Sequence, residues 1–556
     1  MSQAERSPFS RAAALERLGS EQFDVLVIGG GITGAGVALD AAARGLRTAV
    51  VEGRDWAAGT SSKSSKLVHG GLRYLQQKEY RLVYENLYER QRLIENAPHL
   101  VSPLPFLIPL FGKQGTVNKA VAKAYRTALW LYDLTGGVRI GHRHRRMSHD
   151  EALKHLPTLR TDLLAAAFLY WDAQTDDARL TLAIVRTAVV EHGAVAANYS
   201  PVKEILHGPG GEATGARLAE GTVVRARVIV NAAGVWTDDV RELDEGEHPD
   251  SLRPAKGIHL TVPAAKLPCD IAAVVPVPRD RRSIFVVPWG EHTYIGTTDT
   301  EYHGTLDDPQ VTPEDVDYVL GAINTWVTDP IRPEDVTGSW AGLRPLVKGE
   351  AKERTADLSR RHAVSTSPSG VVTITGGKLT TYRRMAADAI DAASEVLGHG
   401  VRKSPTKNLR IRGAVGVDDL RKPDAASRAG VDAGVLAHLV RRYGSEAGAV
   451  ADLVRDDPSL GEPLVPGLPY LRAEAVFAAR HEMAHTLDDV LARRTRALLL
   501  GRDAMVAAAL DVAKLVALEL GWDDAEIARQ VEDVTAIAEH ERTTAGLPHT
   551  AAPSVR

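Results

Sequence analysis

The feature that most constrains this chain is a glycine-rich turn that directly follows a short apolar run. Residues 25–34 read VLVIGGGITG. The apolar run predicts a buried parallel strand, and Gly29, Gly31 and Gly34 have the spacing that allows a tight turn, close approach of a pyrophosphate and helix–strand packing. The backbone N–H groups that open the next helix, expected over 33–44, would face the phosphates. The pattern therefore predicts the start of a dinucleotide-binding βαβ unit.

An acidic residue completes this unit. Gly45 is expected to end the helix, residues 46–51 form the second predicted strand, and Glu52 ends that strand. A carboxylate at this point can accept hydrogen bonds from both ribose hydroxyls, which favours FAD or NAD over a cofactor with a 2′-phosphate. The unit by itself does not choose between FAD and NAD.

Length and composition exclude several classes of protein. The 556 residues carry a formal net charge of −4, which gives no support for a nucleic-acid partner. The single cysteine, Cys269, cannot form an intramolecular disulfide and fits a reducing compartment. An apolar signal core is absent at the N-terminus, and no apolar stretch reaches the length of about 18 residues that a spanning helix needs. We expect a cytoplasmic protein, with peripheral attachment to the cytoplasmic face of a membrane left open.

Strands and helices are distributed unevenly along the chain. Up to about residue 395, β-branched segments alternate with alanine-rich helical segments, which is typical of an α/β architecture. After that point the pattern predicts helices alone, at 435–442, 473–493, 504–520 and 524–538. The sequence thus predicts an α/β part followed by an all-helical domain.

A run of hydroxyl side chains follows Glu52. Residues 59–75 read GTSSKSSKLVHGGLRYL and continue into an apolar, aromatic helix, unlike a flexible linker, although a solvated loop is the alternative. Serine and threonine hydroxyls can bond to pyrophosphate oxygens, and the Gly70-Gly71 pair would let the backbone approach a flat ring. The candidate cofactor-binding residues in this run are Thr60, Ser61, Ser62, Ser64, Ser65, Lys66, His69 and Gly70.

Two later strands also lead into glycine-containing turns. Residues 228–236 read VIVNAAGVW, and residues 371–383 read VVTITGGKLTTYR. A strand that passes through two glycines into a helix aims backbone N–H groups at an electron-rich ligand, here the edge of a reduced flavin. The Gly-Lys pair is not a P-loop, because Val372 stands where that motif requires glycine. The candidate cofactor-binding residues here are Ala233, Gly234, Gly376, Gly377, Lys378, Leu379 and Thr380.

Four segments together resemble the FAD-dependent, respiratory-type glycerol-3-phosphate dehydrogenases. They are GGGITG at 29–34, SSKLVHGGLRYL at 64–75, GLRPL at 342–346 and TGGKLTTYR at 375–383. The resemblance covers nearly the whole chain. It implies a glutathione-reductase-like, D-amino-acid-oxidase-type FAD domain interleaved with a β-sheet substrate domain over 21–396, and a helical C-terminal domain over 397–545. The expected FAD parts are about 21–100, 165–245 and 350–396, and the expected substrate parts are about 101–164 and 246–349.

The resemblance also implies a reaction. FAD would oxidise sn-glycerol 3-phosphate to dihydroxyacetone phosphate, with hydride moving from C2 to the flavin N5 and electrons passing to a membrane quinone. Arg344, Lys378, Arg73 and Arg360 stand at family-like positions, where guanidinium groups and an ammonium suit a phosphate dianion. The register of Arg360 against Arg361 is open. An oxygen-using glycerol-3-phosphate oxidase, a related amine or amino-acid oxidase, and a nucleotide-binding sensor remain as alternatives.

Oxidation of a secondary alcohol also requires a base for the hydroxyl proton. The candidates are His69, beside the diglycine, and His259, in a predicted strand at 256–262. Tyr74 either hydrogen-bonds the substrate or packs. Thr298 and Asp299 either line the site or end a strand, and we favour the strand end. The residues alone do not choose among these candidates.

One motif points to a different chemistry. Residues 481–485 read HEMAH and match the zinc-peptidase pattern HExxH on the predicted helix 473–493. Asp488 and Leu491 stand where the longer motif needs Gly and His, and no glutamate occurs between residue 485 and Glu519. We therefore expect no metal site and interpret the histidines as residues on a helix surface.

Evidence for membrane contact is a basic helix after an apolar segment. Residues 104–111 read LPFLIPLF, and the next predicted helix carries Lys119, Lys123 and Arg126 on one side. Attachment to anionic lipid and a solvated basic face over a buried helix are both open. The sequence also leaves a homodimer open.

Overall fold

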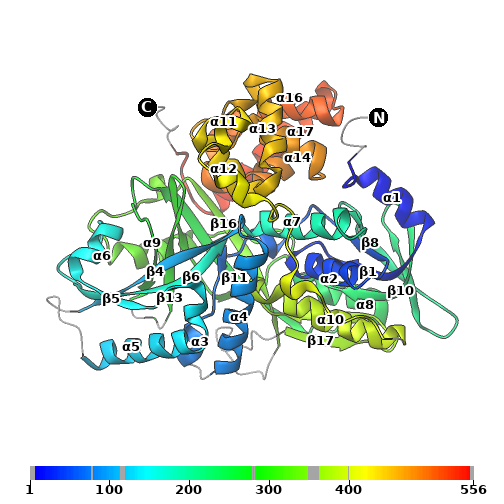
Figure 1. Cartoon of the computed structure of the whole chain (residues 1–556), viewed down its shortest axis with the longest axis horizontal. Coiled ribbons are helices and arrows are strands. Elements are labelled where there is room, and N and C mark those ends of the chain that lie inside the picture. The colour runs from blue at the N-terminus through cyan, green and yellow to red at the C-terminus, as the bar shows by residue number, and fades with distance from the viewer. Residues whose placement is uncertain are drawn as a thin grey trace.

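The computed structural model describes residues 7–550 apart from 77–78, 113–118, 279, 281, 349–361 and 399, and apart from the side chains of 73, 76 and 119–121. Two β-sheets lie next to each other, and helices cover both of them (Figure 1). The helices of the C-terminal part form a separate group that packs against the other two parts. The cavity described below opens between the sheets.

The first sheet is largely parallel. Its described strands are β1 (Gln22–Ile28), β2 (Thr48–Val51), β7 (Val195–Ala197), β8 (Val202–His207), β9 (Ala213–Leu218), β10 (Val223–Asn231), β17 (His362–Thr366) and β18 (Val372–Gly376). Their order is β17-β18-β10-β1-β2-β7, with the β8-β9 hairpin joined to β10. Leu26 lies opposite Ile229 on one side and Ala49 on the other. The central strands β1 and β2 are nearly continuous apolar runs because helices bury both faces of the sheet there.

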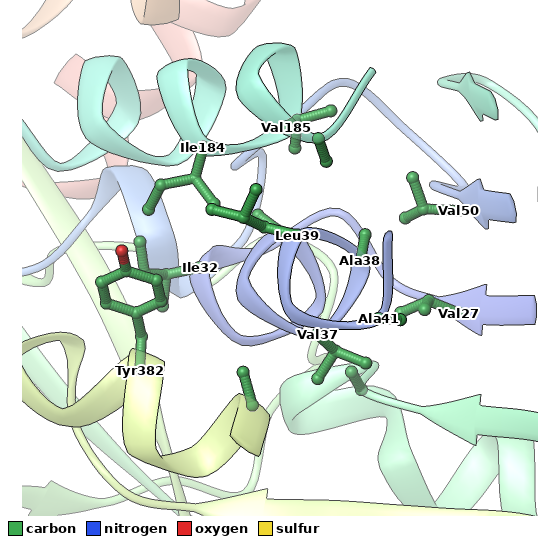
Figure 2. Close-up of a cluster of buried hydrophobic side chains, with 14 of the residues drawn as sticks. Val27, Ile32, Val37, Ala38, Leu39, Ala41, Val50, Ile184, Val185 and Tyr382 are labelled. Carbon is green, nitrogen blue, oxygen red and sulfur yellow. The ribbon is translucent and has the colours of Figure 1, made fainter. Parts of the chain in front are cut away.

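Helices pack on both faces of this sheet and form a hydrophobic core on each face. The helices around it are α1 (Arg11–Ser20), α2 (Ile32–Ala43), α7 (Asp177–Val190), α8 (Thr237–Glu245) and α10 (Tyr382–Leu397). Figure 2 shows α2 between Ile184 of α7, Tyr382 of α10 and the strand residue Val27. Gly36 permits this approach, because a Cβ atom there would lie 2.6 Å from the Tyr382 ring. The turn that the sequence predicts is thereby fixed between the sheet and two other helices.

The second sheet is mostly antiparallel. Its described strands are β3 (Leu67–Val68), β4 (Val101–Phe111), β5 (Arg145–Met147), β6 (Leu164–Thr175), β11 (Leu252–Pro263), β12 (Ala272–Pro276), β13 (Ser283–Trp289), β14 (His292–Gly296), β15 (Thr300–Glu301) and β16 (Gly338–Val347). Their order is β15-β11-β14-β13-β12-β4-β6-β3, with β16 beside β11 and β5 beside β6. Its helices are α3 (Arg73–Gln76), α4 (Tyr80–Asn96), α5 (Lys119–Leu134), α6 (His149–His155) and α9 (Pro313–Asn324).

The apolar segment 104–111 belongs to an inner strand of this sheet. It forms most of β4, which pairs with β6 on one side and β12 on the other. Phe106 and Ile108 pack on the side of α4 and α5, whereas Leu107 packs on the opposite face. The segment therefore alternates between two protein cores and does not face a membrane. Among the described residues, no helix is both long and apolar enough to cross a bilayer.

The C-terminal helices have a hydrophobic core of their own. They are α11 (Ala425–Ala429), α12 (Ala433–Tyr443), α13 (Ala447–Asp456), α14 (Arg472–His481), α15 (Ala497–Leu500), α16 (Arg502–Leu520) and α17 (Asp524–Thr544). The domain limits remain predictions.

The predicted helix 473–493 is wrong in its second half. Helix α14 ends at His481, Met483 has a positive φ of 56°, and a π-helical turn follows at Asp489–Arg494. The break occurs where the buried Glu482 carboxylate pairs with Arg179 at 2.7 Å. The two histidines of HEMAH are therefore not on one helix face, nor is His485 on a helix surface. No described cluster of His, Cys, Asp or Glu is arranged to hold a metal ion.

Gly34 gives a test of the helix–strand contact. A Cβ atom at Gly34 would lie 1.8 Å from the carbonyl oxygen of Gly29. Gly34→Ala should therefore destabilise the protein by roughly 1–3 kcal/mol in thermal or denaturant unfolding. In the control Gly321→Ala the new Cβ atom, on α9, meets no atom within 4 Å, and we expect neutral or slightly raised stability. Equal stability of the two variants would contradict the close approach.

Candidate functional site

One large cavity lies at the carboxyl ends of the parallel strands and extends to the second sheet. Its volume is about 1100 Å³. Ile28 at the end of β1, Val51 at the end of β2 and Gly376 at the end of β18 line it, together with Arg344 of β16. This is the edge at which open α/β sheets bind their ligands, because helix N-termini and loops converge there.

The N-terminus of α2 faces this cavity. Gly29, Gly31, Ile32 and Thr33 line it, and the N-cap residue Gly31 offers no side chain to the first helical N–H groups. One of these groups, Ile32 N–H, donates to Ser61 Oγ at 2.9 Å. A helix N-terminus whose N-cap residue has no side chain is a fitting site for a pyrophosphate. Gly34 does not line the cavity. It packs instead against the carbonyl oxygen of Gly29.

Glu52 lies at the same edge with its carboxylate already oriented. The carboxylate accepts hydrogen bonds from the backbone N–H of Gly30 at 2.5 Å and of Arg54 at 2.8 Å. Burial raises the pKa of Glu52, and these two hydrogen bonds oppose that shift. The position suits recognition of ribose hydroxyls. Trp236 and Arg54, which the sequence analysis did not select, also line the cavity, and the Arg54 guanidinium lies 5.5 Å from the Trp236 ring centre.

The hydroxyl run divides into cavity residues and support residues. Thr60, Ser61, Ser64 and Ser65 line the cavity, as do Ala233 and Gly234 from the turn after β10. Three predicted cofactor-binding residues, Ser62, Lys66 and Gly70, do not line it. The Lys66 ammonium is instead buried against Asp177 at 3.0 Å and the carbonyl oxygen of Ser62 at 3.0 Å, because a buried charge needs such partners.

The backbone of Gly70 is bound by a cluster of buried polar side chains. Its N–H donates to Asp172 Oδ1 at 3.0 Å and lies within 3.0 Å of the Tyr132 hydroxyl. Asp172 also accepts from Tyr132 at 2.6 Å and from Arg90 at 2.6 Å. These contacts fix the diglycine and the neighbouring His69. Asp172 lines the cavity and was missed in the sequence because its partners lie 40 to 102 residues away.

Candidate residues from two distant segments meet at the second glycine turn. Gly376, Gly377, Lys378, Leu379 and Thr380 all line the cavity, together with His69 and Tyr74. The His69 N–H donates to Thr380 Oγ1 at 3.2 Å, and the Lys378 ammonium lies 3.9 Å from the centre of the Tyr74 ring. The fold thereby brings three predicted catalytic residues together: a histidine, a tyrosine and a lysine.

Arg344 reaches the cavity from β16. Its guanidinium donates to Asp299 Oδ1, Thr297 Oγ1 and the Thr298 carbonyl oxygen, each at 3.2 Å. Thr297, Thr298 and Asp299 also line the cavity. The sequence analysis favoured the interpretation that Thr298 and Asp299 only end a strand. In the structure both residues follow the end of β14 and line the cavity. They orient the arginine.

The second histidine candidate, His259, does not line the cavity. Its ring stacks on Trp340 with 4.7 Å between ring centres, and its Nε2 lies 2.9 Å from Ser65 Oγ. Burial, assisted by Lys66 and Arg344, lowers its pKa well below the usual value. His259 therefore supports Ser65 from behind. The Arg73 side chain and all of Arg360 lie outside the described residues.

An apolar limb extends the cavity along β4. Phe106, Ile108 and Leu110 line it from that strand, and Tyr125 of α5 and Phe285 of β13 complete it. The sequence analysis did not predict this limb, since its walls come from elements far apart in the chain. The cavity thus combines a polar, glycine-rich part with an apolar part, as many small-molecule sites do.

Comparisons with known proteins identify the family of the chain. The model of the FAD dependent oxidoreductase family matches residues 24–383, and that of the C-terminal domain of alpha-glycerophosphate oxidase matches residues 404–527. Glycerol-3-phosphate dehydrogenase 2 of Mycobacterium tuberculosis is 43% identical over 545 residues, which cover 96% of this chain and 91% of the relative. The mitochondrial glycerol-3-phosphate dehydrogenase of Mus musculus is 36% identical, covering 95% of this chain and 75% of the relative.

A solved structure extends the agreement to the fold. The glycerol-3-phosphate dehydrogenase of Bacillus halodurans, complexed with FAD, superposes with a TM-score of 0.77 at 31% identity and covers 99% of both chains. The predicted fold class, with FAD-oxidoreductase sheets and a helical C-terminal part, is confirmed.

Proposed function

Because the chain belongs to the FAD-dependent glycerol-3-phosphate dehydrogenase family, we propose that it oxidises sn-glycerol 3-phosphate to dihydroxyacetone phosphate and delivers the electrons to a membrane quinone. The observation that carries the proposal is one cavity lined both by the glycine turns of a dinucleotide site and by the cations Arg344 and Lys378. A phosphate-bearing alcohol and a flavin could therefore meet there.

Residues at the carboxyl edge of the first sheet would hold FAD. The Glu52 carboxylate would accept hydrogen bonds from the ribose hydroxyls. The N-terminus of α2 would bind the pyrophosphate, aided by the Ser61 hydroxyl. The N–H groups of the Gly376-Gly377 turn would face the flavin. Bound FAD supplies the acceptor for the hydride that leaves C2 of the substrate.

The chain's own residues would carry the substrate and the proton. Arg344 and Lys378 would bind the phosphate dianion, with Arg344 held in place by Asp299. Among the described residues that line the cavity, His69 is the one histidine, so we assign it the removal of the hydroxyl proton while the C2–O bond becomes a carbonyl. The role of Arg73 and Arg360 in phosphate binding stays a prediction.

A surface patch beside the apolar limb supports a membrane acceptor. Tyr84 and Tyr88 of α4 and Trp130 and Leu134 of α5 are exposed, although they are large and apolar or aromatic. Arg139 lies over both tyrosine rings, at 5.3 and 4.6 Å. Aromatic rings interleaved with basic groups suit the headgroup layer of a bilayer. The other side of α5 contributes Tyr125 to the apolar limb, through which a quinone would approach.

The reaction can be tested on the purified flavoprotein. Anaerobic addition of glycerol 3-phosphate should bleach the flavin absorption, and a short-chain quinone should restore it. Stoichiometric peroxide formation in air, without a response to quinone, would favour the oxidase alternative. If glycerol 3-phosphate, lactate and amino acids all failed to bleach the flavin, the proposed function would be wrong.

Arg344 provides a test of substrate recognition. Arg344→Ala should lower kcat/KM for glycerol 3-phosphate by roughly ten- to a hundredfold, since a charge-assisted hydrogen bond contributes about 1.5–3 kcal/mol. FAD content should remain at the wild-type level. Arg253→Ala serves as control, because Arg253 lies on the same sheet but pairs with Glu301 outside the cavity. Loss of FAD from Arg344→Ala would show that its role lies in cofactor binding instead.

The surface patch can be tested with vesicles. The double variant Tyr84→Ala/Trp130→Ala should bind anionic vesicles at least roughly tenfold more weakly, because full burial of even one large apolar side chain contributes about 1.5–3 kcal/mol. Binding should also weaken as salt is raised. Leu510→Ala/Leu518→Ala removes exposed leucines of α16 and should have no effect. If the wild-type protein does not bind vesicles, this mode of attachment is wrong. The proposal that the protein oxidises glycerol 3-phosphate would be unaffected.

A further inference from the structure

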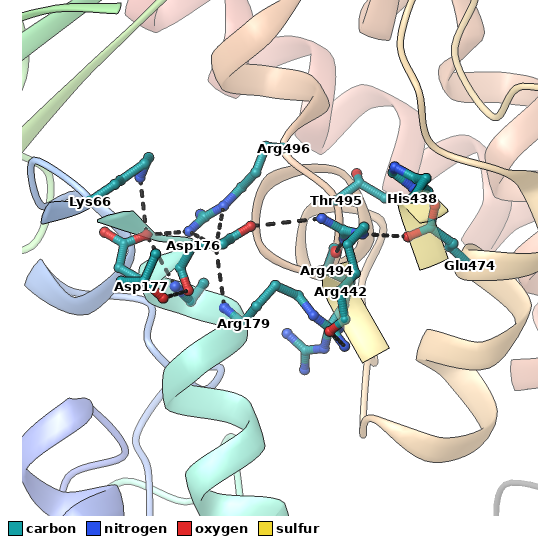
Figure 3. Close-up of polar contacts among 12 residues, drawn as sticks. Lys66, Asp176, Asp177, Arg179, His438, Arg442, Glu474, Arg494, Thr495 and Arg496 are labelled. Atoms are coloured by element: carbon teal, nitrogen blue, oxygen red, sulfur yellow. Dashed lines mark hydrogen bonds and ion pairs between the residues drawn. The ribbon is translucent and has the colours of Figure 1, made fainter. Parts of the chain in front are cut away.

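Buried charged groups connect the C-terminal helices to the loop that carries the cavity serines. We define residues 62–66 as the serine loop. Figure 3 shows Arg496 directed from the C-terminal part toward Asp176 and Asp177, which stand at the N-terminus of α7, and Lys66 approaching Asp177. The sequence analysis did not predict this network of charges.

Arg496 is held by several acceptors. Its Nη2 atom lies 2.7 Å from Asp176 Oδ1 and also donates to Asp177 Oδ1, while Nε lies 3.0 Å from Asp176 Oδ1. Nη1 reaches the carbonyl oxygen of Ser62 at 3.5 Å. The guanidinium therefore contacts the serine loop directly and, through Asp177, indirectly.

Asp177 passes this contact on to Ser64. Its Oδ2 atom accepts from the Ser64 N–H at 3.0 Å and from the Ser64 hydroxyl at 2.7 Å. Its Oδ1 atom accepts from the Lys66 ammonium at 3.0 Å. One carboxylate thus binds both the serine loop and Arg496. Ser64 lines the cavity. Its position is set in part by Asp177, which in turn binds Arg496 of the C-terminal part.

The charges in this network are almost completely buried. The side chains of Arg496, Asp177 and Lys66 are 1%, 0% and 3% exposed. Burial alone would raise the pKa of Asp176, but Arg496 and Arg442 outweigh it and lower that pKa to about 2. Burial lowers the pKa of Lys66 to about 8 against the opposing effect of Asp177. Removing Arg496 would leave the buried carboxylates of Asp176 and Asp177 with one cation fewer in a dry interior, which is costly.

The opposite side of the serine loop is held by the second sheet. Trp340 donates to the carbonyl oxygen of Ser64 at 3.2 Å, and Tyr294 donates to that of Ser65 at 2.7 Å. His259 lies against the Ser65 hydroxyl. Residues from the second sheet and Arg496 from the C-terminal part therefore both contact the serine loop. Without Arg496, Asp177 would keep its own bonds to Ser64 and Lys66 but would lose the group that connects it to the C-terminal part.

We propose that Arg496 is a positioning residue through which the C-terminal helices hold the serine loop against FAD. This rests on the proposed FAD site, and it assigns the helical part a role in cofactor retention. Among the described residues, none from the C-terminal helices lines the cavity. They act through Asp177, which fixes Ser64 and Lys66.

The test compares two arginine variants of the full-length protein. Arg496→Met should raise the dissociation constant of FAD by roughly tenfold or more, measured by reconstitution of apoprotein, because a buried charge pair loses one partner. The KM for glycerol 3-phosphate should change little in the FAD-loaded fraction. Arg480→Met is the matched control: Arg480 pairs with Glu519 at 2.6 Å inside the C-terminal helices, away from the serine loop. It should keep FAD affinity while it lowers stability.

Two further variants separate positioning from general destabilisation. Arg496→Lys keeps the charge but loses the fork, so it should fold even if Arg496→Met does not, with FAD affinity below wild type. In the double variant Arg496→Met/Asp177→Asn, the two losses of FAD affinity should be less than additive, because both act on one connection. Wild-type FAD affinity in both Arg496 variants, or equal losses in Arg480→Met, would overturn the proposal. Wild-type protein that binds no FAD would instead overturn the proposed function.

Discussion

The contact between the start of α2 and the end of β1 is the constraint on which the rest of the structure depends. Gly34 packs on the Gly29 carbonyl, and Gly29 itself lies against the Ala232 backbone, so that three segments meet without side chains. This close approach brings an uncapped helix N-terminus to the cavity edge. Glu52 and the Gly376-Gly377 turn reach the same edge because their strands run parallel to β1.

Buried ion pairs then determine how the parts of the chain dock. Asp55, which comes shortly after Glu52, is bound by Arg493 and Arg494 at 2.6 Å each. Arg496 makes a similar contact with Asp176 and Asp177. Such pairs add little net stability, because desolvation offsets most of the attraction, but a mismatched arrangement would leave bare charges inside the protein. They therefore favour one docking geometry of the C-terminal helices over others.

The cavity joins two environments that the proposed reaction requires. The polar part offers helix N–H groups, hydroxyls and cations, which suit phosphates and a flavin edge. The apolar part offers aromatic and aliphatic walls that suit a lipid-soluble acceptor. Helix α5 connects the apolar part of the cavity with the protein surface. Its Tyr125 lines the apolar limb, and its Trp130 is exposed on the other side of the helix. Electron donor and acceptor would thus reach one cofactor by different routes.

Local patterns were sufficient to predict the dinucleotide turn, the strands that lead into it and the helical C-terminal part, because glycine spacing and apolar periodicity act over a few residues. They failed where partners are distant. His259 and Ser65 are separated by 194 positions, and only the fold shows that the histidine supports the serine behind the cavity. The predicted helix through HEMAH ends at His481, next to Glu482, whose partner Arg179 lies 303 positions away. The sequence by itself determined the cofactor class and the glycine frame; the tertiary structure decided which polar side chains line the cavity, since burial forces each remaining charge to find a partner from another part of the chain.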